Sequence, residues 1–179
     1  VGADLDPLSV LISRAKTTPI SASELSKVAR IPHEVDYSDG TPSLIPEVKN
    51  LHHWFTPDAV RELSAVKSRC LTLPEPTKTF ALVVFSSIIR RVSNADDQTQ
   101  KTYVSHTLPK RPPPPHELLP IFVQRAIRGM EEYARLLPKP PSGTVLQADA
   151  RWVPAGAEFE DVVTSPPMWT QSSTSTTRC

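Results

Sequence analysis

Apolar residues recur at every third or fourth position along much of this chain, which is the spacing of an α-helix with one buried face. This pattern predicts helices over residues 7–16, 21–30, 56–70, 80–92 and 116–137. Local signals support two of the helix starts. Asp6-Pro7 and Thr56-Pro57 each place an N-cap residue before a proline that suits the first helical position. We therefore expect most of the chain to be helical.

Long polar segments connect these predicted helices. Residues 31–50 are rich in Pro, Asp, Ser and Gly, and residues 93–115 are polar and end in four consecutive prolines. The whole chain has 20 prolines and only five glycines, which predicts stiff connections rather than flexible ones. We expect both segments to be loops. Residues 170–179 are polar and low in complexity, and we expect that tail to be disordered.

Two apolar runs late in the chain do not follow the helical spacing. Residues 144–149 and 159–164 are typical of buried strands, and the first residues of the chain look like the end of another strand. A strand end, a helix, a helical segment and two strands fit part of a parallel sheet with helices on its faces. We predict an α/β fold. Residues 1–20 form a strand end and helix, 21–142 a mostly helical insertion, and 143–169 two strands and a loop.

Polar residues stand where the three predicted strands end. Asp4 and Asp149 close the first two strands, and Ser165-Pro166-Pro167 follows the last one. In open α/β sheets, ligands bind beyond the carboxyl ends of the strands, so these residues are expected to converge on one crevice. The prolines end the strand in a rigid turn, at which the Ser165 hydroxyl and the Pro166 carbonyl are hydrogen-bond acceptors.

This turn resembles the catalytic loop of S-adenosylmethionine-dependent DNA methyltransferases that modify N4 of cytosine or N6 of adenine. Their loop reads Asp/Asn/Ser-Pro-Pro-aromatic, whereas here Met168 follows the prolines. The stretch from Gln147 to Arg151 is similar to their Gly-Asp-Ala-Arg motif, with Ala148 in place of the glycine. The segment 85–94 also looks like an insertion found in one group of bacterial DNA methylases. The resemblance spans most of residues 1–169 and implies a partial Rossmann-like methyltransferase sheet with a large helical insertion.

The resemblance implies a role for each of these residues. Asp4 would accept hydrogen bonds from the ribose of S-adenosylmethionine, and Asp149 would reach its adenine amino group. Ser165, Pro166 and Pro167 would be catalytic, because acceptors aimed at the hydrogens of an exocyclic amine free its lone pair for attack on the methyl group. The partner would be double-stranded DNA, from which the target base is flipped out.

The family also carries a glycine-rich Phe-x-Gly-x-Gly loop just before the strand that ends at Asp4. This chain begins after that position, and its five glycines supply no substitute. We therefore expect an internal fragment or a degenerate remnant of a larger enzyme. Such a fragment should bind the cofactor weakly and should be inactive alone.

Composition narrows the remaining possibilities. With 20 basic and 19 acidic residues, any DNA-binding surface must be a local patch. The five histidines and two cysteines show no metal-ligand spacing, so no metal is expected. No apolar run approaches the length that spans a bilayer, and no signal peptide is evident. The two distant cysteines, Cys70 and Cys179, are compatible with a reducing compartment, and we expect a cytoplasmic protein without membrane contact.

Two other functions fit the sequence. One is a non-enzymatic, mostly helical interaction protein with proline-rich connectors. The other is a methyltransferase that acts on RNA or on protein, because related loops serve those substrates. The methyltransferase hypothesis predicts that the strands ending at Asp4, Asp149 and Thr164 lie side by side in parallel, whereas an interaction protein requires no such arrangement.

Overall fold

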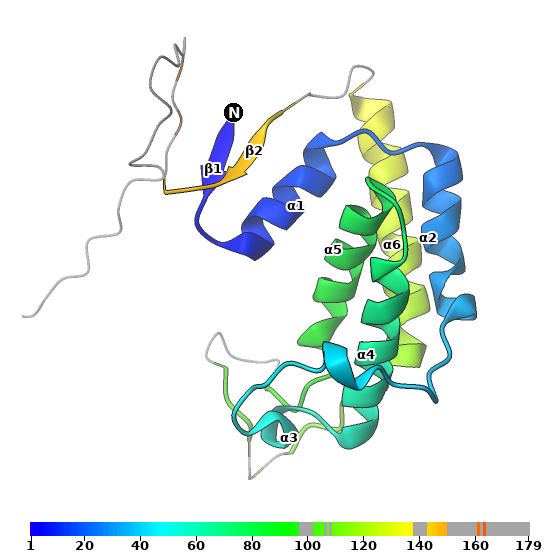
Figure 1. The fold of residues 1–179 in the computed structure, drawn as a ribbon, viewed down its shortest axis with the longest axis vertical. Coiled ribbons are helices and arrows are strands. Elements are labelled where there is room, and N and C mark those ends of the chain that lie inside the picture. The colour runs from blue at the N-terminus through cyan, green and yellow to red at the C-terminus, as the bar shows by residue number, and fades with distance from the viewer. Residues whose placement is uncertain are drawn as a thin grey trace, which may run out of the picture.

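The computed structural model describes residues 1–96, 102–105, 107, 109–137, 143–149, 161 and 163. These residues form a helical bundle with a small parallel sheet at one end (Figure 1). The strands are β1 (Gly2–Asp4) and β2 (Val145–Gln147). The helices are α1 (Pro7–Thr17), α2 (Ala22–Glu34), the 3-10 helix η1 (Pro42–Leu44), α3 (Leu51–Trp54), α4 (Pro57–Leu71), α5 (Thr77–Ile89) and α6 (Pro115–Leu136).

Side-chain caps fix the starts of three helices. Asp6 accepts from the backbone N–H of Ser9 at α1, and the Thr56 hydroxyl accepts from the third residue of α4. Ser21 and Glu24 form a reciprocal capping box at α2, in which each side chain accepts from the other residue's backbone N–H. The caps at Asp6 and Thr56 were predicted. The Ser-x-x-Glu spacing that identifies the third cap was present in the sequence but was not used.

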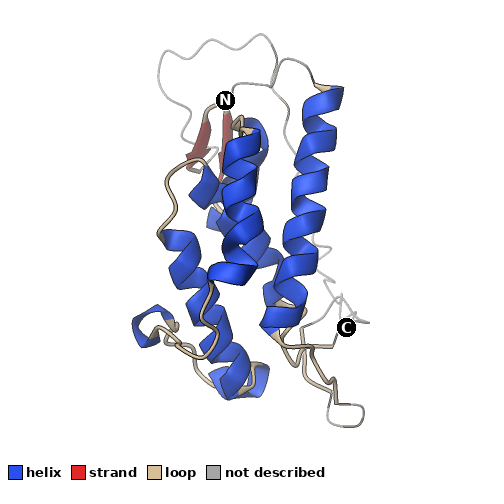
Figure 2. Cartoon of the chain, turned by 90° about the vertical axis from the view of Figure 1, so that its right-hand side faces the viewer, coloured by secondary structure: helices blue, strands red, loops and turns tan. Residues whose placement is uncertain are grey.

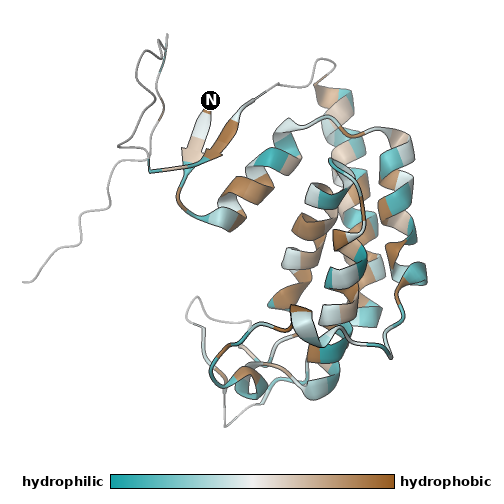
Figure 3. Cartoon of the chain, in the orientation of Figure 1, coloured by the Kyte–Doolittle hydropathy of each residue, from teal (hydrophilic) through white to brown (hydrophobic). Residues whose placement is uncertain are grey.

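The hydrophobic core lies between α2, α4, α5 and α6, and α5 contacts all three of the others. Each of these helices contributes a side chain that is almost fully buried: Val28, Val66, Ile88 and Leu119. Figure 3 shows that apolar residues make up much of α5. The core confirms the helical spacing in the sequence, because the side chains that recur at three to four positions are the buried ones.

The segment 31–50 corrects one prediction, because it is not all loop. Helix α2 continues through Pro32 to Glu34, and η1 and α3 form in the same region. Proline removes a helical donor, so a local rule places the end of α2 earlier. Tertiary contacts outweigh that cost: Ile31 is 2% exposed, and Glu34 accepts hydrogen bonds from the Arg69 guanidinium of α4. Contacts with other helices therefore stabilise the last turn of α2.

The sheet pairs strands that are far apart in the chain. β1 and β2 run parallel, with Ala3 opposite Leu146 and Asp4 opposite Gln147. Helix α1 contacts both strands on one side and α5 on the other (Figures 1 and 2). The predicted parallel arrangement is confirmed for this pair, and the described fold is compatible with an α/β class. The predicted strand over 159–164 lies outside the described residues.

Candidate functional site: the carboxyl edge of the parallel pair

The parallel pairing puts Asp4 and Asp149 at the carboxyl ends of neighbouring strands. Asp4 is the last residue of β1 and pairs with Gln147, the last residue of β2. Asp149 lies two residues after Gln147. The Asp4 carbonyl also accepts from the Ala148 backbone N–H at 3.1 Å, so the chain stays beside β1 beyond the end of β2. Asp4 is exposed and Asp149 is half-buried. The edge therefore presents carboxylates from two segments that the sequence separates by more than a hundred residues.

Three hydrogen bonds build the turn after β1. Asp4 Oδ1 accepts from the backbone N–H of Asp6 at 2.9 Å, which holds the Asp4 carboxylate against the turn. Asp6 Oδ2 accepts from both the backbone N–H and the hydroxyl of Ser9, each at 2.8 Å. These bonds from Ser9 lower the pKa of the Asp6 carboxyl. As the sequence predicts, Asp6 caps α1 and Asp4 precedes that helix.

Arg14 ties the far strand to the same helix. Its Nη2 and Nε atoms donate to the Val145 carbonyl at 3.1 and 3.3 Å, a contact that links α1 to β2. The sequence showed Arg14 only as a basic residue in the last turn of a helix. Nothing local indicated that its guanidinium reaches a strand 131 residues later. This contact helps to fix the position of the edge at which Asp149 stands.

The predicted catalytic residues Ser165, Pro166 and Pro167 lie outside the described residues, as does Met168. The structure therefore places two of the five predicted site residues, Asp4 and Asp149. Within the described ranges, no group of three or more His, Cys, Asp or Glu side chains could hold a metal ion. No helix in that same part of the chain is long and apolar enough to cross a membrane.

A partly buried polar junction, which sequence reasoning missed, joins α4 to the start of α6. The Glu62 carboxylate accepts from the backbone N–H of His116 at 3.0 Å and also lies 3.0 Å from His116 Nδ1. The Glu62 side chain is 8% exposed. The Tyr37 ring meets His116 edge-on at 5.8 Å between centroids, and its hydroxyl donates to the Pro32 carbonyl. Burial, together with the Glu62 charge, raises the pKa of Tyr37 to about 12.

This junction positions helices and lies apart from the edge with Asp4 and Asp149. His116 is the second residue of α6, so the Glu62 carboxylate satisfies a free N–H at the positive end of that helix. Glu62 and His116 are 54 residues apart in the sequence, and a single Glu within an amphipathic helix does not indicate that it caps another helix. We treat it as an anchor for α6 rather than as a reactive centre.

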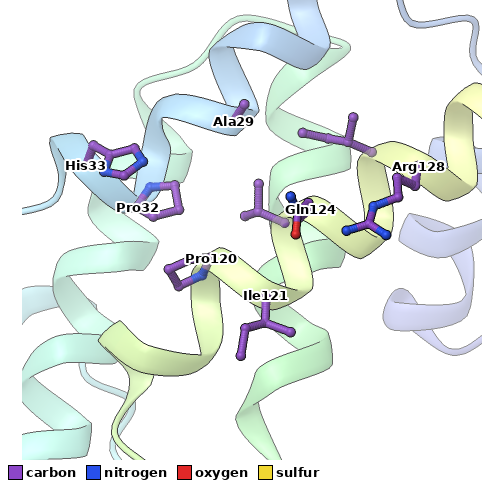
Figure 4. Close-up of a pocket in the computed structure, with 9 residues that line it drawn as sticks. Ala29, Pro32, His33, Pro120, Ile121, Gln124 and Arg128 are labelled. Carbon is purple, nitrogen blue, oxygen red and sulfur yellow. The ribbon is translucent and has the colours of Figure 1, made fainter.

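The hollows on the described residues include one of about 740 Å³ at residues 48–53 and two on the bundle itself. An open groove of about 520 Å³ runs between α2 and α6, where Pro32 and Pro120, the prolines inside those helices, face it together with Ile121 (Figure 4). His33 and Arg128 are among its polar lining residues. None of the predicted site residues lines this groove. A smaller, mostly apolar cavity of about 200 Å³ lies beside α4 and α5.

Comparison with known proteins gives one informative relative. The chain is 30% identical over 112 residues to the Type II methyltransferase M.MvaI of Kocuria varians. The aligned part is 57% of this chain and 24% of the relative, so the chain spans about a quarter of the length of the protein it matches. No family model and no solved structure matches the chain. The similarity supports a relationship to an enzyme of methyltransferase type.

Proposed function

We propose that this chain belongs to an enzyme that transfers a methyl group from S-adenosylmethionine to an exocyclic amino group of a base in double-stranded DNA. The similarity to a Type II methyltransferase is the observation that carries the proposal. It agrees with the resemblance of the Ser165-Pro166-Pro167 motif to the catalytic loop of DNA methyltransferases. The parallel pairing of β1 with β2 adds support, because a helical interaction protein has no need of it.

The described residues of the edge fit the nucleoside part of the cofactor. Asp4 is exposed at the end of a strand, and only one of its carboxylate oxygens is used to hold the following turn. The other oxygen suits a ribose hydroxyl, because an ionised carboxylate has several acceptor positions. Asp149 stands beyond the neighbouring strand and is proposed to accept from the adenine amino group. The bound cofactor supplies an electrophilic methyl group.

The Ser-Pro-Pro turn is proposed to activate the target amine. The lone pair of an exocyclic amine is delocalised into the ring, so the amine is a poor nucleophile. The Ser165 hydroxyl and the Pro166 carbonyl would accept from its two hydrogens and would draw the nitrogen toward tetrahedral geometry. The second proline would restrict the backbone of this segment, so that the acceptors would need no rearrangement during the reaction.

The direct test is methyl transfer by the protein as its own gene expresses it. With labelled S-adenosylmethionine and unmethylated double-stranded genomic DNA, we expect label in the DNA, and nucleoside mass spectrometry then distinguishes cytosine from adenine. Ser165→Ala should reduce the turnover number by about a hundredfold or more, as the loss of a transition-state acceptor does. Asp4→Asn should mainly weaken cofactor binding. Label in RNA or protein but not in DNA would reject the DNA substrate, and no transfer to any of them would reject the enzyme.

A further inference from the structure

The apolar cavity beside α4 and α5 has the features of a binding site for a small organic acid. It is partly open to solvent and lies between the segment after η1, α3, α4 and α5, and its walls include Leu51, Phe55, Leu63, Phe85 and Ile89. Its volume is about 200 Å³. Apolar protein cavities of about 150 Å³ admit benzene, so this one has room for an aromatic ring with a short substituent. A ring there would be covered by aliphatic and aromatic side chains.

Lys67 gives the cavity its chemical specificity. The other described residues that line this cavity are uncharged. The Lys67 Nζ atom donates to the Leu44 carbonyl at 3.3 Å, a long contact that uses one of three ammonium donors. A carboxylate on the ligand would complement the remaining donors, and a charge-assisted bond in an apolar site is stronger than a neutral one.

We propose that this cavity binds a small aryl carboxylate, with the ring between α4 and α5 and the carboxylate on the Lys67 ammonium. The proposal is independent of the methyltransferase assignment, because no residue of the Asp4–Asp149 edge lines the cavity. Phenylacetate is the probe, and phenylacetamide is its neutral counterpart of nearly the same shape. A ligand of this size should bind with a dissociation constant of roughly 1 mM.

The test is a methyl-detected NMR titration of the whole chain with each probe. We expect saturable shifts at Leu63 and Ile89, and phenylacetate should bind about tenfold more tightly than phenylacetamide, as one charge-assisted hydrogen bond predicts. Lys67→Met should remove this preference while phenylacetamide still binds. Lys16→Met is the matched control, since Lys16 is an exposed lysine of α1 that does not line the cavity, and it should leave the preference unchanged. Circular dichroism verifies the fold of each variant.

Three results would overturn the proposal. The first is the absence of saturable shifts at the cavity methyl groups up to the solubility limit of phenylacetate. The second is binding whose shifts lie outside the cavity. The third is a preference for the acid that persists in Lys67→Met, since the ammonium would then play no part. If Lys67→Met does not fold, Lys67→Gln replaces it, because the amide keeps the length and polarity of the side chain without its charge.

Discussion

The Glu62–His116 junction allows a sharp prediction about what holds α6 in place. Removal of the carboxylate in Glu62→Leu leaves the His116 backbone N–H without its acceptor at the start of a 22-residue helix. The contact is 3.0 Å long and the Glu62 side chain is 8% exposed, so water replaces the lost acceptor poorly. Such a helix cap contributes about 0.5–2 kcal/mol, and a buried hydrogen bond to a charged group about 1.5–3 kcal/mol.

We therefore expect Glu62→Leu to lower the free energy of unfolding by about 2–3 kcal/mol. Glu62→Gln keeps an acceptor for the N–H but gives up the charge near the helix dipole, and its cost should be about 1 kcal/mol. Glu117→Gln is the control, since it removes an exposed acid from the same turn of α6 and should cost at most about 0.5 kcal/mol.

Urea unfolding followed by far-UV circular dichroism at 25 °C and neutral pH measures all three variants on one scale. A loss of unfolding free energy that decreases from Glu62→Leu to Glu62→Gln and then to the Glu117→Gln control would indicate a buried acceptor. A buried charge is costly to desolvate, and a leucine in its place could recover that cost through packing. If Glu62→Leu is as stable as the unmodified chain, the desolvation cost equals the hydrogen-bond gain, and the junction does not anchor α6.

Three further predictions follow from single contacts. Gly40→Ala should destabilise the chain by about 1 kcal/mol in the same unfolding assay, because the new Cβ would meet Arg61 Cγ at 2.7 Å; unchanged stability would show that Arg61 moves aside freely. Burial raises the pKa of the Cys70 thiol to about 12, so with the other cysteine replaced by serine, a thiol reagent at pH 8 should react only after unfolding. Rapid reaction of the folded protein would contradict the burial of Cys70. Because the pKa of this thiol is higher in the folded protein than in the unfolded chain, the stability it contributes is retained below pH 9 and falls as the pH rises toward 12. Arg14→Met should speed hydrogen exchange at the backbone N–H of Ala148, which donates to the Asp4 carbonyl, and should leave exchange in the core of α5 unchanged; an unchanged exchange rate at Ala148 would disprove the anchoring role.

Much of the helical architecture could be predicted because its signals are local. The Thr56-Pro57 start of α4 and the apolar spacing through α5 and α6 act within one or two helical turns, so adjacent residues suffice to reveal them. The same was true of the strand that leads to Asp149. Sequence reasoning failed where a distant partner overrides a local rule. Pro32 alone indicates a helix end, yet α2 continues because its last turn is buried and tied to α4.

The candidate site divides along the same line. Neighbouring residues were sufficient to identify the motifs of the chain, which include Ser165-Pro166-Pro167 and the acids at the strand ends. These motifs suggested methyltransferase chemistry from the sequence alone. The parallel strands themselves were expected, but the contacts that hold them were not. The contact of the Arg14 guanidinium with the Val145 carbonyl joins residues 131 positions apart and appears only once the chain has folded.

Sequence by itself determined where the helices other than η1, α3 and the last turn of α2 form, and where β1 and β2 end, because hydrogen bonding and apolar spacing within an element depend on nearby side chains. Only the tertiary structure decided which distant groups meet. The Lys67 contact at the cavity and the Glu62 cap on α6 join residues that are 23 and 54 positions apart in the sequence. Such contacts carry no local signal, since their stability comes from burial and loop closure over the whole bundle.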